Sequence, residues 1–228
     1  MKTKMNEWKH IFKLDPAKEI SDEQLDILCT SGTDAVMVGG TDDITYQGVE
    51  DLLNRMSHYS VHKILEISRM DAITTGFDDY FIPMVLNSKE KKWMMDMHHQ
   101  GIKQHMDYMD YVQPVFEGYC ILNEEAKAFQ YTNSMLPDSE DTLVYAYMAE
   151  EVFHLPIFYL EYSGKYGDAE LVKQVSHQLN DTLLFYGGGI ENADQAKEMK
   201  QYADVIIVGN SIYTDFDKAL ETVQAVNA

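Results

Sequence analysis

The chain has few basic residues, few cysteines and no long apolar run. Its 228 residues include 18 lysines and arginines against 38 aspartates and glutamates, which gives a formal net charge of −20. A charge of that sign repels the phosphate backbone of nucleic acids, so we expect no nucleic-acid partner. It also repels small phosphate ligands. Any phosphate site must therefore be built locally, from backbone N–H groups, helix N-termini or a metal ion.

The scarcity of cysteines and apolar runs bears on the compartment. Cys29 and Cys120 lie far apart and form no CxxC pair, as expected of buried thiols in a reducing cytosol. The opening residues MKTKMNEWKH lack the apolar core of a signal peptide. No segment approaches the ~18 apolar residues of a membrane span. We expect a soluble, cytoplasmic protein, for which transient contact with a membrane surface stays open.

Eight short apolar segments carry the main structural signal. They are nearly continuous apolar runs, as expected for strands buried on both faces. They lie at 11–14, 35–38, 63–67, 80–86, 119–122, 157–160, 183–186 and 205–208. Helical patterns alternate with them at 22–30, 47–55, 138–153, 169–179, 192–201 and 216–225, with a capping box from Ser21 and Gln24 before the first.

This alternation predicts a parallel sheet with right-handed crossovers, and eight strands predict closure into a TIM (β/α)8 barrel. No composition break or linker interrupts the chain, so we expect residues 1–228 to form a single domain. Only residues 68–79 join the third and fourth strands. We expect the outer helix there to be missing or irregular.

Glycine-rich turns follow the last two predicted strands. The seventh strand runs into Gly187, Gly188 and Gly189, and the eighth into Gly209 and Asn210. Barrels often have a phosphate site after these strands, where glycine lets the backbone approach the ligand. The alternative is a pair of tight turns that need glycine for a positive φ. Two such turns at adjacent strand ends favour a phosphate site, but they indicate no reaction.

Charged residues follow the first two strands. Lys13 and Asp15 point to the same side of their strand, and Thr41 follows the second strand. A lysine and an aspartate in a barrel mouth are costly to bury unless they pair or bind a ligand. Oxygen ligands from Asp15, Thr41 and a phosphate would suit Mg²⁺. A Lys13–Asp15 ion pair with a helix cap from Thr41 is equally consistent with the sequence.

The sixth strand ends in a further polar segment. Tyr159 and Glu161 share one face, and the turn at Ser163 and Gly164 offers N–H donors. A carboxylate at this place would act as a general base for a hydroxyl, or would orient a polar substrate. The alternative is a Glu161 that pairs with Lys13 or Lys165.

Taken in order, these strand ends resemble the geranylgeranylglyceryl phosphate synthase family, and within it the bacterial heptaprenylglyceryl phosphate synthases. The resemblance covers nearly the whole chain, through FKLDP at 12–16, VGGT at 38–41, YLEYSG at 159–164, GGGI at 187–190 and VGN at 208–210. The chain reads DPAK at 15–18, where archaeal relatives often read DPDK. This difference favours the bacterial branch.

The resemblance implies a Mg²⁺-dependent prenyltransferase, often a homodimer. Such an enzyme joins the C3 hydroxyl of sn-glycerol 1-phosphate to a polyprenyl diphosphate, here heptaprenyl diphosphate, and releases diphosphate in ether-lipid biosynthesis. It implies Asp15 and Thr41 as metal ligands, and Glu161, Lys13 and Tyr159 as catalytic residues. The substrate contacts that it implies are Lys13, Tyr159, Leu160, Glu161, Tyr162, Ser163, Gly164, Gly189, Gly209 and Asn210.

Two other functions stay open from the sequence. A sugar-phosphate isomerase or aldolase would need a paired acid and base or a Schiff-base lysine, and Lys13 has no second lysine at a clear strand end opposite it. A non-catalytic phosphate-binding barrel would need none of Asp15, Thr41 and Glu161. Six of the fourteen methionines lie between Met84 and Met109 around Trp93, where they would line a groove for a prenyl tail or pack as ordinary core.

Overall fold

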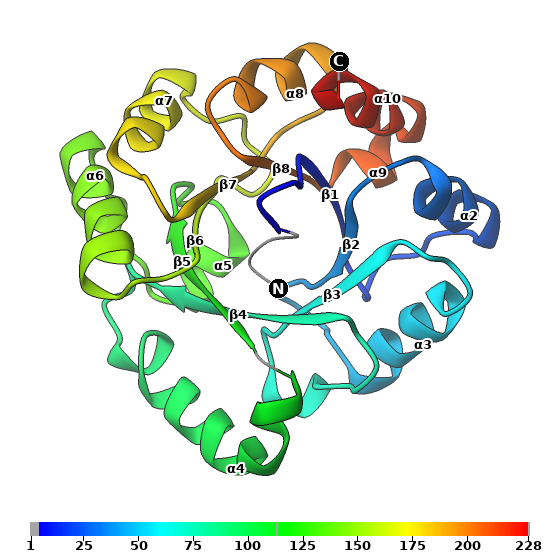
Figure 1. Ribbon diagram of the computed structural model, residues 1–228, viewed down its shortest axis with the longest axis horizontal. Coiled ribbons are helices and arrows are strands. Elements are labelled where there is room, and N and C mark those ends of the chain that lie inside the picture. The colour runs from blue at the N-terminus through cyan, green and yellow to red at the C-terminus, as the bar shows by residue number, and fades with distance from the viewer. Residues whose placement is uncertain (1–4, 113, 228) are drawn as a thin grey trace.

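The computed structural model describes residues 5–112 and 114–227, and its centre is a closed barrel of parallel strands (Figure 1). Each strand pairs with the next in the chain, and the last pairs with the first. The strands are β1 His10–Leu14, β2 Ala35–Val38, β3 His62–Glu66, β4 Asp79–Val85, β5 Val115–Ile121, β6 Ile157–Glu161, β7 Leu183–Gly187 and β8 Val205–Val208. The predicted TIM barrel is confirmed.

The helices surround the barrel in a ring, except α5, which lies inside the ring (Figure 1). They are α2 Asp22–Thr30, α3 Tyr46–Met56, α4 Asp96–Val112, α5 Lys127–Tyr131, α6 Ser139–Tyr147, α7 Ala169–Gln178, α8 Ala193–Lys200, α9 Ser211–Thr214 and α10 Phe216–Asn227. Shorter turns are η1 Met70–Ala72, η2 Lys91–Trp93 and the π-helical η3 Met148–Val152. Across residues 5–112 and 114–227, no helix combines the length and apolar character needed to cross a bilayer.

Two details of the helix ring test the sequence predictions. The capping box of Ser21 and Gln24 is present at the start of α2. Only the 3-10 turn η1 lies between β3 and β4, so the missing outer helix is confirmed. No helix was predicted over α4, whose backbone leaves helical geometry at His105 (φ −115°, ψ 20°).

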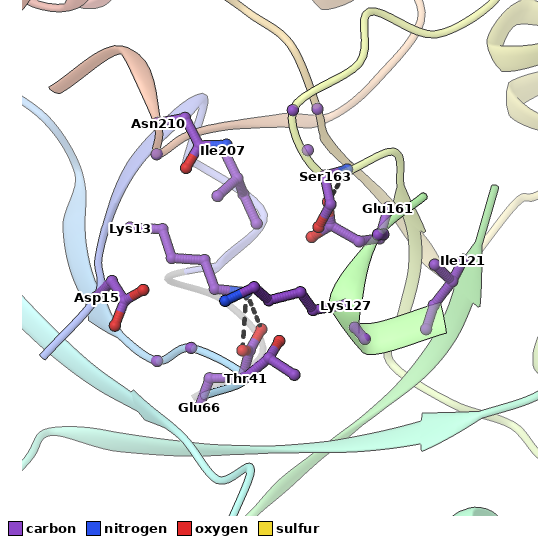
Figure 2. A pocket seen from close by; sticks show the side chains of 18 of the residues that line it. Lys13, Asp15, Thr41, Glu66, Ile121, Lys127, Glu161, Ser163, Ile207 and Asn210 are labelled. Atoms are coloured by element: carbon purple, nitrogen blue, oxygen red, sulfur yellow. Dashed lines mark hydrogen bonds and ion pairs between the residues drawn. The ribbon is translucent and has the colours of Figure 1, made fainter. Parts of the chain in front are cut away.

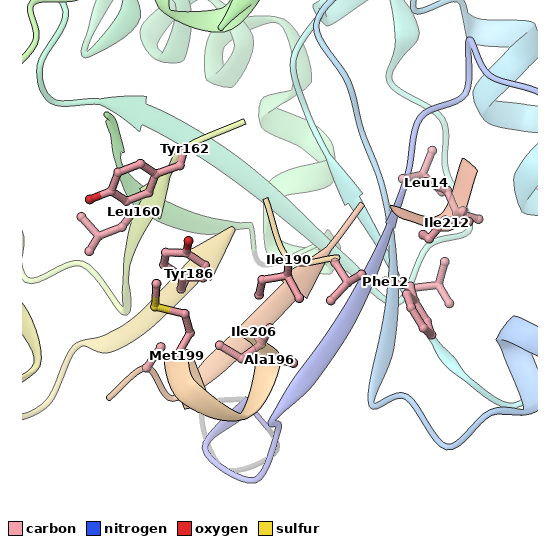
Figure 3. Close-up of a cluster of buried hydrophobic side chains, with 14 of the residues drawn as sticks. Phe12, Leu14, Leu160, Tyr162, Tyr186, Ile190, Ala196, Met199, Ile206 and Ile212 are labelled. Atoms are coloured by element: carbon pink, nitrogen blue, oxygen red, sulfur yellow. The ribbon is translucent and has the colours of Figure 1, made fainter. Parts of the chain in front are cut away.

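Side chains of the strands alternate between the barrel interior and the layer under the helices. On β1, Ile11 belongs to the interior core, whereas Phe12 and Leu14 belong to the outer cluster. Figure 3 shows this outer cluster, where strand residues pack beneath α8 and α9. Because both faces of each strand are covered, the strands read as nearly continuous apolar runs.

The fifth strand begins four residues before its predicted start, at Val115 rather than Tyr119. Glu117 and Gly118 interrupt the apolar run that the prediction relied on. Gly118 faces a tight part of the outer layer, where an added Cβ would lie 3.1 Å from a methyl group of Leu155. Glu117 is fully buried in the barrel. The buried carboxyl group of Glu117 therefore kept the first part of β5 from being recognised as a strand in the sequence.

Candidate active site

A cavity of about 780 Å³ opens at the carboxyl ends of the strands. Catalytic residues of TIM barrels come from this end, because the βα loops converge there. Figure 2 shows charged side chains reaching into the cavity from several strand ends. The predicted residues that line it are Lys13, Asp15, Thr41, Tyr159, Glu161, Ser163, Gly164, Gly189, Gly209 and Asn210. The fold thus brings together every predicted site residue except Leu160 and Tyr162.

The side chains of Leu160 and Tyr162 lie on the other face of β6. Both belong to the outer cluster, and the Tyr162 ring packs 5.8 Å from the ring of Tyr186 (Figure 3). Since neighbouring residues of a strand face opposite ways, Tyr159 and Glu161 point inward and these two point outward. Any ligand contact at these two positions must come from backbone atoms.

Lys13 forms an ion pair with Glu66 at the end of β3. Its ammonium lies 2.8 Å from Oε1 and 2.7 Å from Oε2 of Glu66, so the alternative Lys13–Asp15 pair is not what the structure contains. Burial alone would lower the pKa of Lys13, but the charges of Glu66 and Glu161 outweigh burial and raise it. Lys13 is therefore a charged ammonium, which is unsuited to Schiff-base chemistry.

Glu161 is held by two hydrogen bonds. The hydroxyl of Tyr119 donates to Oε2 at 2.9 Å, and the backbone N–H of Ser163 donates to Oε1. A turn with positive φ at Ser163 and Gly164 aims that N–H back at the carboxylate. Among the residues that the structure describes, no lysine pairs with Glu161, so the alternative pairs with Lys13 and Lys165 are not formed. The carboxylate is buried and held in one orientation.

The two tyrosines beside Glu161 are hydrogen-bond donors rather than bases. Burial, followed by the charge of Glu161, raises the pKa of both Tyr119 and Tyr159 well above the ordinary value. Their rings lie 5.9 Å and 5.6 Å from the Lys13 ammonium, so they also form its apolar wall.

The glycine-rich turn after β7 is crowded as well as strained. Gly189 has a φ of +57°, and a Cβ there would collide with the backbone of Lys165 and Tyr166. Across the cavity mouth, a Cβ on Gly164 would lie 3.3 Å from Nδ2 of Asn210. Glycine is needed here both for positive φ and for close approach. The turns after β6, β7 and β8 therefore converge on one part of the mouth.

Asp15 and Thr41 lie at another part of the mouth. The loop after β2 presses against Asp15, since a Cβ on Gly40 would lie 2.8 Å from Oδ1 of Asp15. The side chain of Thr45 caps α3 by accepting the N–H of Gly48, so the alternative of a Thr41 cap was wrong. In the described part of the chain, no three His, Cys, Asp or Glu side chains are grouped to hold a metal.

Two buried carboxyl groups at or beneath the cavity were not predicted from the sequence. Glu66 is the last residue of β3. The pattern that could have identified it as a site residue is its position two residues after Ile64, which faces the barrel interior. Glu117 lies deeper on β5 and is fully buried. Its side-chain oxygens have no hydrogen-bond partner among the described residues. The interrupted apolar run at 117–118 was its only signal in the sequence.

The closed barrel and the charged cavity at its carboxyl end are those of a TIM-barrel enzyme. The chain belongs to the PcrB family, whose sequence model matches residues 3–227. It is 64% identical over 223 residues to a heptaprenylglyceryl phosphate synthase of Oceanobacillus iheyensis, covering 97% of both chains. A heptaprenylglyceryl phosphate synthase of a Geobacillus species is 56% identical over 223 residues, covering 97% of this chain and 98% of the relative.

A solved structure shares the fold at lower identity. It is the (S)-3-O-geranylgeranylglyceryl phosphate synthase of Thermoplasma acidophilum, in complex with its substrate sn-glycerol-1-phosphate. The TM-score is 0.84 at 21% identity, and the match covers 98% of this chain and 95% of that one. The resemblance drawn from the strand ends is confirmed by the family match and by the two bacterial relatives.

Proposed function

We propose that this chain transfers a long prenyl group, heptaprenyl by likeness to its relatives, from its diphosphate to the C3 hydroxyl of sn-glycerol 1-phosphate. The observation that carries the proposal is the oriented carboxylate of Glu161, which lies in one cavity with Lys13 and Asp15. Phosphate binding alone would need no such carboxylate. The names of the bacterial relatives agree with this reaction.

Glycerol 1-phosphate would bind where the turns after β6, β7 and β8 converge. Backbone N–H groups of glycine turns attract a phosphate without needing positive side chains. The hydroxyl of Ser211 supports this position, because it is buried in the cavity wall without a partner in the described residues. Gly189, Gly209 and Asn210 would contact the phosphate, and Tyr159 and Glu161 the glycerol hydroxyls.

Asp15 and Thr41 would hold Mg²⁺. Oxygen donors in small number fit this ion, which keeps several waters and takes substrate phosphates as ligands. Oδ1 of Asp15 accepts the N–H of Ala17 at 3.0 Å, which orients the carboxylate in the mouth. When bound, Mg²⁺ supplies positive charge against the leaving diphosphate.

Glu161 would act on the attacking hydroxyl. Its carboxylate takes the C3 hydroxyl proton, the hydroxyl oxygen bonds to the first carbon of the prenyl chain, and the bond from that carbon to diphosphate breaks. Tyr119 and the N–H of Ser163 keep the carboxylate in place during this step. The positive charge of Lys13 would stabilise the dianionic phosphate of the bound glycerol 1-phosphate. Fixing the acceptor in this way supplies much of the rate.

One wall of the cavity suits a prenyl chain. It includes the apolar or aromatic side chains of Val85, Trp93, Ile121 and Tyr131. Of the methionine-rich stretch between Met84 and Met109, Trp93 lies in this wall, whereas its described methionines do not. Aromatic and aliphatic side chains at the mouth would begin the groove for the tail.

The test is transfer of label from radioactive glycerol 1-phosphate into organic solvent, with Mg²⁺ and prenyl diphosphates of graded length. We expect extractable product with the wild type and a preference for the heptaprenyl donor. Glu161→Gln, which cannot accept the proton, should reduce turnover about 10²–10⁴-fold while keeping affinity for glycerol 1-phosphate. Asp15→Asn should abolish the dependence on Mg²⁺ together with the activity.

Lys173→Gln serves as a control, since Lys173 is a half-buried residue of α7 outside the cavity, whose side chain pairs only with Glu170 among the described residues. No extractable label with any donor, despite measured binding of glycerol 1-phosphate, would overturn the transferase proposal. The non-catalytic phosphate-binding barrel would then be the better description.

A further inference from the structure

Lys127 extends across the mouth of the cavity. It is the first residue of α5, after β5, and its ammonium forms an ion pair with Oδ2 of Asp42 in the loop after β2. Figure 2 shows its side chain reaching across the mouth. Both residues line the cavity. Their side chains are 73% and 47% exposed, so the pair is surrounded by water and contributes little to stability. A ligand of higher negative charge can therefore displace Asp42 at small cost.

Lys127 is also the cation best placed to bind an anion near Asp15. The described wall of the cavity contains three lysines, Lys13, Lys18 and Lys127. Glu66 holds Lys13 with both carboxylate oxygens. Lys18 donates to Asn210 at 3.1 Å and lies 4.8 Å from the centre of the Tyr213 ring. Both are engaged elsewhere in the cavity.

The surroundings of Lys127 are strongly acidic. The hydrogen bond and charge of Asp42, with smaller contributions from Asp43 and Asp15, raise the pKa of Lys127, so it stays positive. Without it, a diphosphate entering beside Asp15 would meet the carboxylates of Asp15 and Asp42 with no lysine from α5 to balance their charge. Ammonium–phosphate hydrogen bonds are among the stronger hydrogen bonds in proteins, because both partners are charged.

We propose that Lys127 exchanges Asp42 for the diphosphate of the prenyl donor and anchors that diphosphate during transfer. The inference rests on the proposed function and adds a binding residue to it. Lys127 would bind the donor in its ground state and would stabilise the charge that grows on the departing diphosphate. The acceptor, bound near Asn210, would not contact it.

The experiment compares Lys127→Gln and Lys127→Arg with the wild type, and Lys173→Gln is the control for loss of one ion-paired lysine outside the cavity. Steady-state kinetics give KM for each substrate, and calorimetry gives the affinity for inorganic pyrophosphate with Mg²⁺ and saturating glycerol 1-phosphate. We expect Lys127→Gln to raise KM for the donor about tenfold and to weaken pyrophosphate binding similarly. KM for glycerol 1-phosphate should change less than about twofold, and Lys127→Arg should stay close to wild type.

An unchanged donor KM and pyrophosphate affinity in Lys127→Gln would overturn the inference. So would equal increases in both KM values with a lower unfolding temperature, which would indicate a structural role. Failure of the proposed function itself looks different, because the wild type would then transfer no label. The pyrophosphate measurement would still decide whether Lys127 binds a diphosphate.

Discussion

Glu117 is the most unusual single residue of the barrel. It is fully buried, and neither side-chain oxygen has a hydrogen-bond partner in the described residues. Burial, together with the charge of Glu66, raises its pKa well above the ordinary value, and Lys13 offsets only part of this. Lys13 is already paired with Glu66, so Glu117 is best accommodated as a neutral acid.

Glu117→Gln should change how stability depends on pH. A carboxyl group whose pKa is raised by folding contributes stability below its ordinary pKa of 4.5 and loses it as the pH rises through the raised value. Since glutamine has no such titration, the variant should unfold at a higher temperature than the wild type at pH 9, and the difference should shrink toward pH 5. Melting curves at several pH values check this. The exposed Glu140→Gln is the control, and parallel curves for wild type and Glu117→Gln would contradict the expectation.

At the scale of elements, the turn between β7 and α8 depends on the turn before α7. The N–H of Tyr162 donates to the carbonyl of Gly187 at 2.7 Å, and the backbone at Tyr166 leaves no room for a side chain at Gly189. Asn192 then caps α8 by accepting the N–H of Gln195. Two loops are thus fixed against each other at the proposed phosphate position.

Gly189→Ala should damage both stability and phosphate binding. An alanine at φ +57° costs about 1 kcal/mol in backbone strain, and the collision with the Tyr166 backbone adds to it. We expect affinity for glycerol 1-phosphate to fall about tenfold or more, measured by calorimetry alongside urea unfolding. Gly32→Ala is the matched control, because its φ is +90° with open space around the added Cβ. Gly32→Ala should lower the free energy of unfolding through backbone strain but should keep the affinity for glycerol 1-phosphate. Equal affinities in the two variants would contradict this account.

At the scale of the molecule, His10 ties the two ends of the chain together. On β1, its Nδ1 lies 2.9 Å from the hydroxyl of Thr33, and its Nε2 lies 2.9 Å from the hydroxyl of Thr222 on α10. The imidazole is fully buried. Burial lowers its pKa to about 3, so the folded protein keeps it neutral.

Acid should therefore lower the free energy of unfolding of the barrel through His10. In the unfolded chain the imidazole binds a proton near pH 6.5, whereas in the folded protein it binds one only near pH 3. The stability that His10 contributes is therefore complete above pH 6.5 and is lost as the pH falls from 6.5 toward 3. The loss is on the order of a few kcal/mol. His10→Gln should be less stable at pH 7 but flatter between pH 6.5 and 4, as urea unfolding would measure. The exposed His177→Gln should keep the wild-type slope, and a wild-type slope in His10→Gln would refute the assignment.

Much of the fold was predictable because it depends on local patterns. Continuous apolar runs identified the strands, and alternation predicted that Lys13 and Asp15 share one face of β1 and that Tyr159 and Glu161 share one face of β6. The length of the segment between β3 and β4 predicted the absence of an outer helix there. The limits of β5 were not predictable in the same way, because Glu117 has no place in an apolar pattern until the barrel closes around it.

The sequence by itself determined that Lys13 and Asp15 share one face of β1 and that Tyr159 and Glu161 share one face of β6, and it placed the turn glycines after β7 and β8, since strand parity and turn composition depend only on neighbours in the chain. Tertiary structure alone decided the partners: Glu66 for Lys13, Tyr119 for Glu161 and Asp42 for Lys127. In a TIM barrel, a layer of interior side chains comes from alternate strands, so β1 meets β3 across the barrel rather than its neighbour β2. That meeting depends on closure and register, which no local pattern encodes.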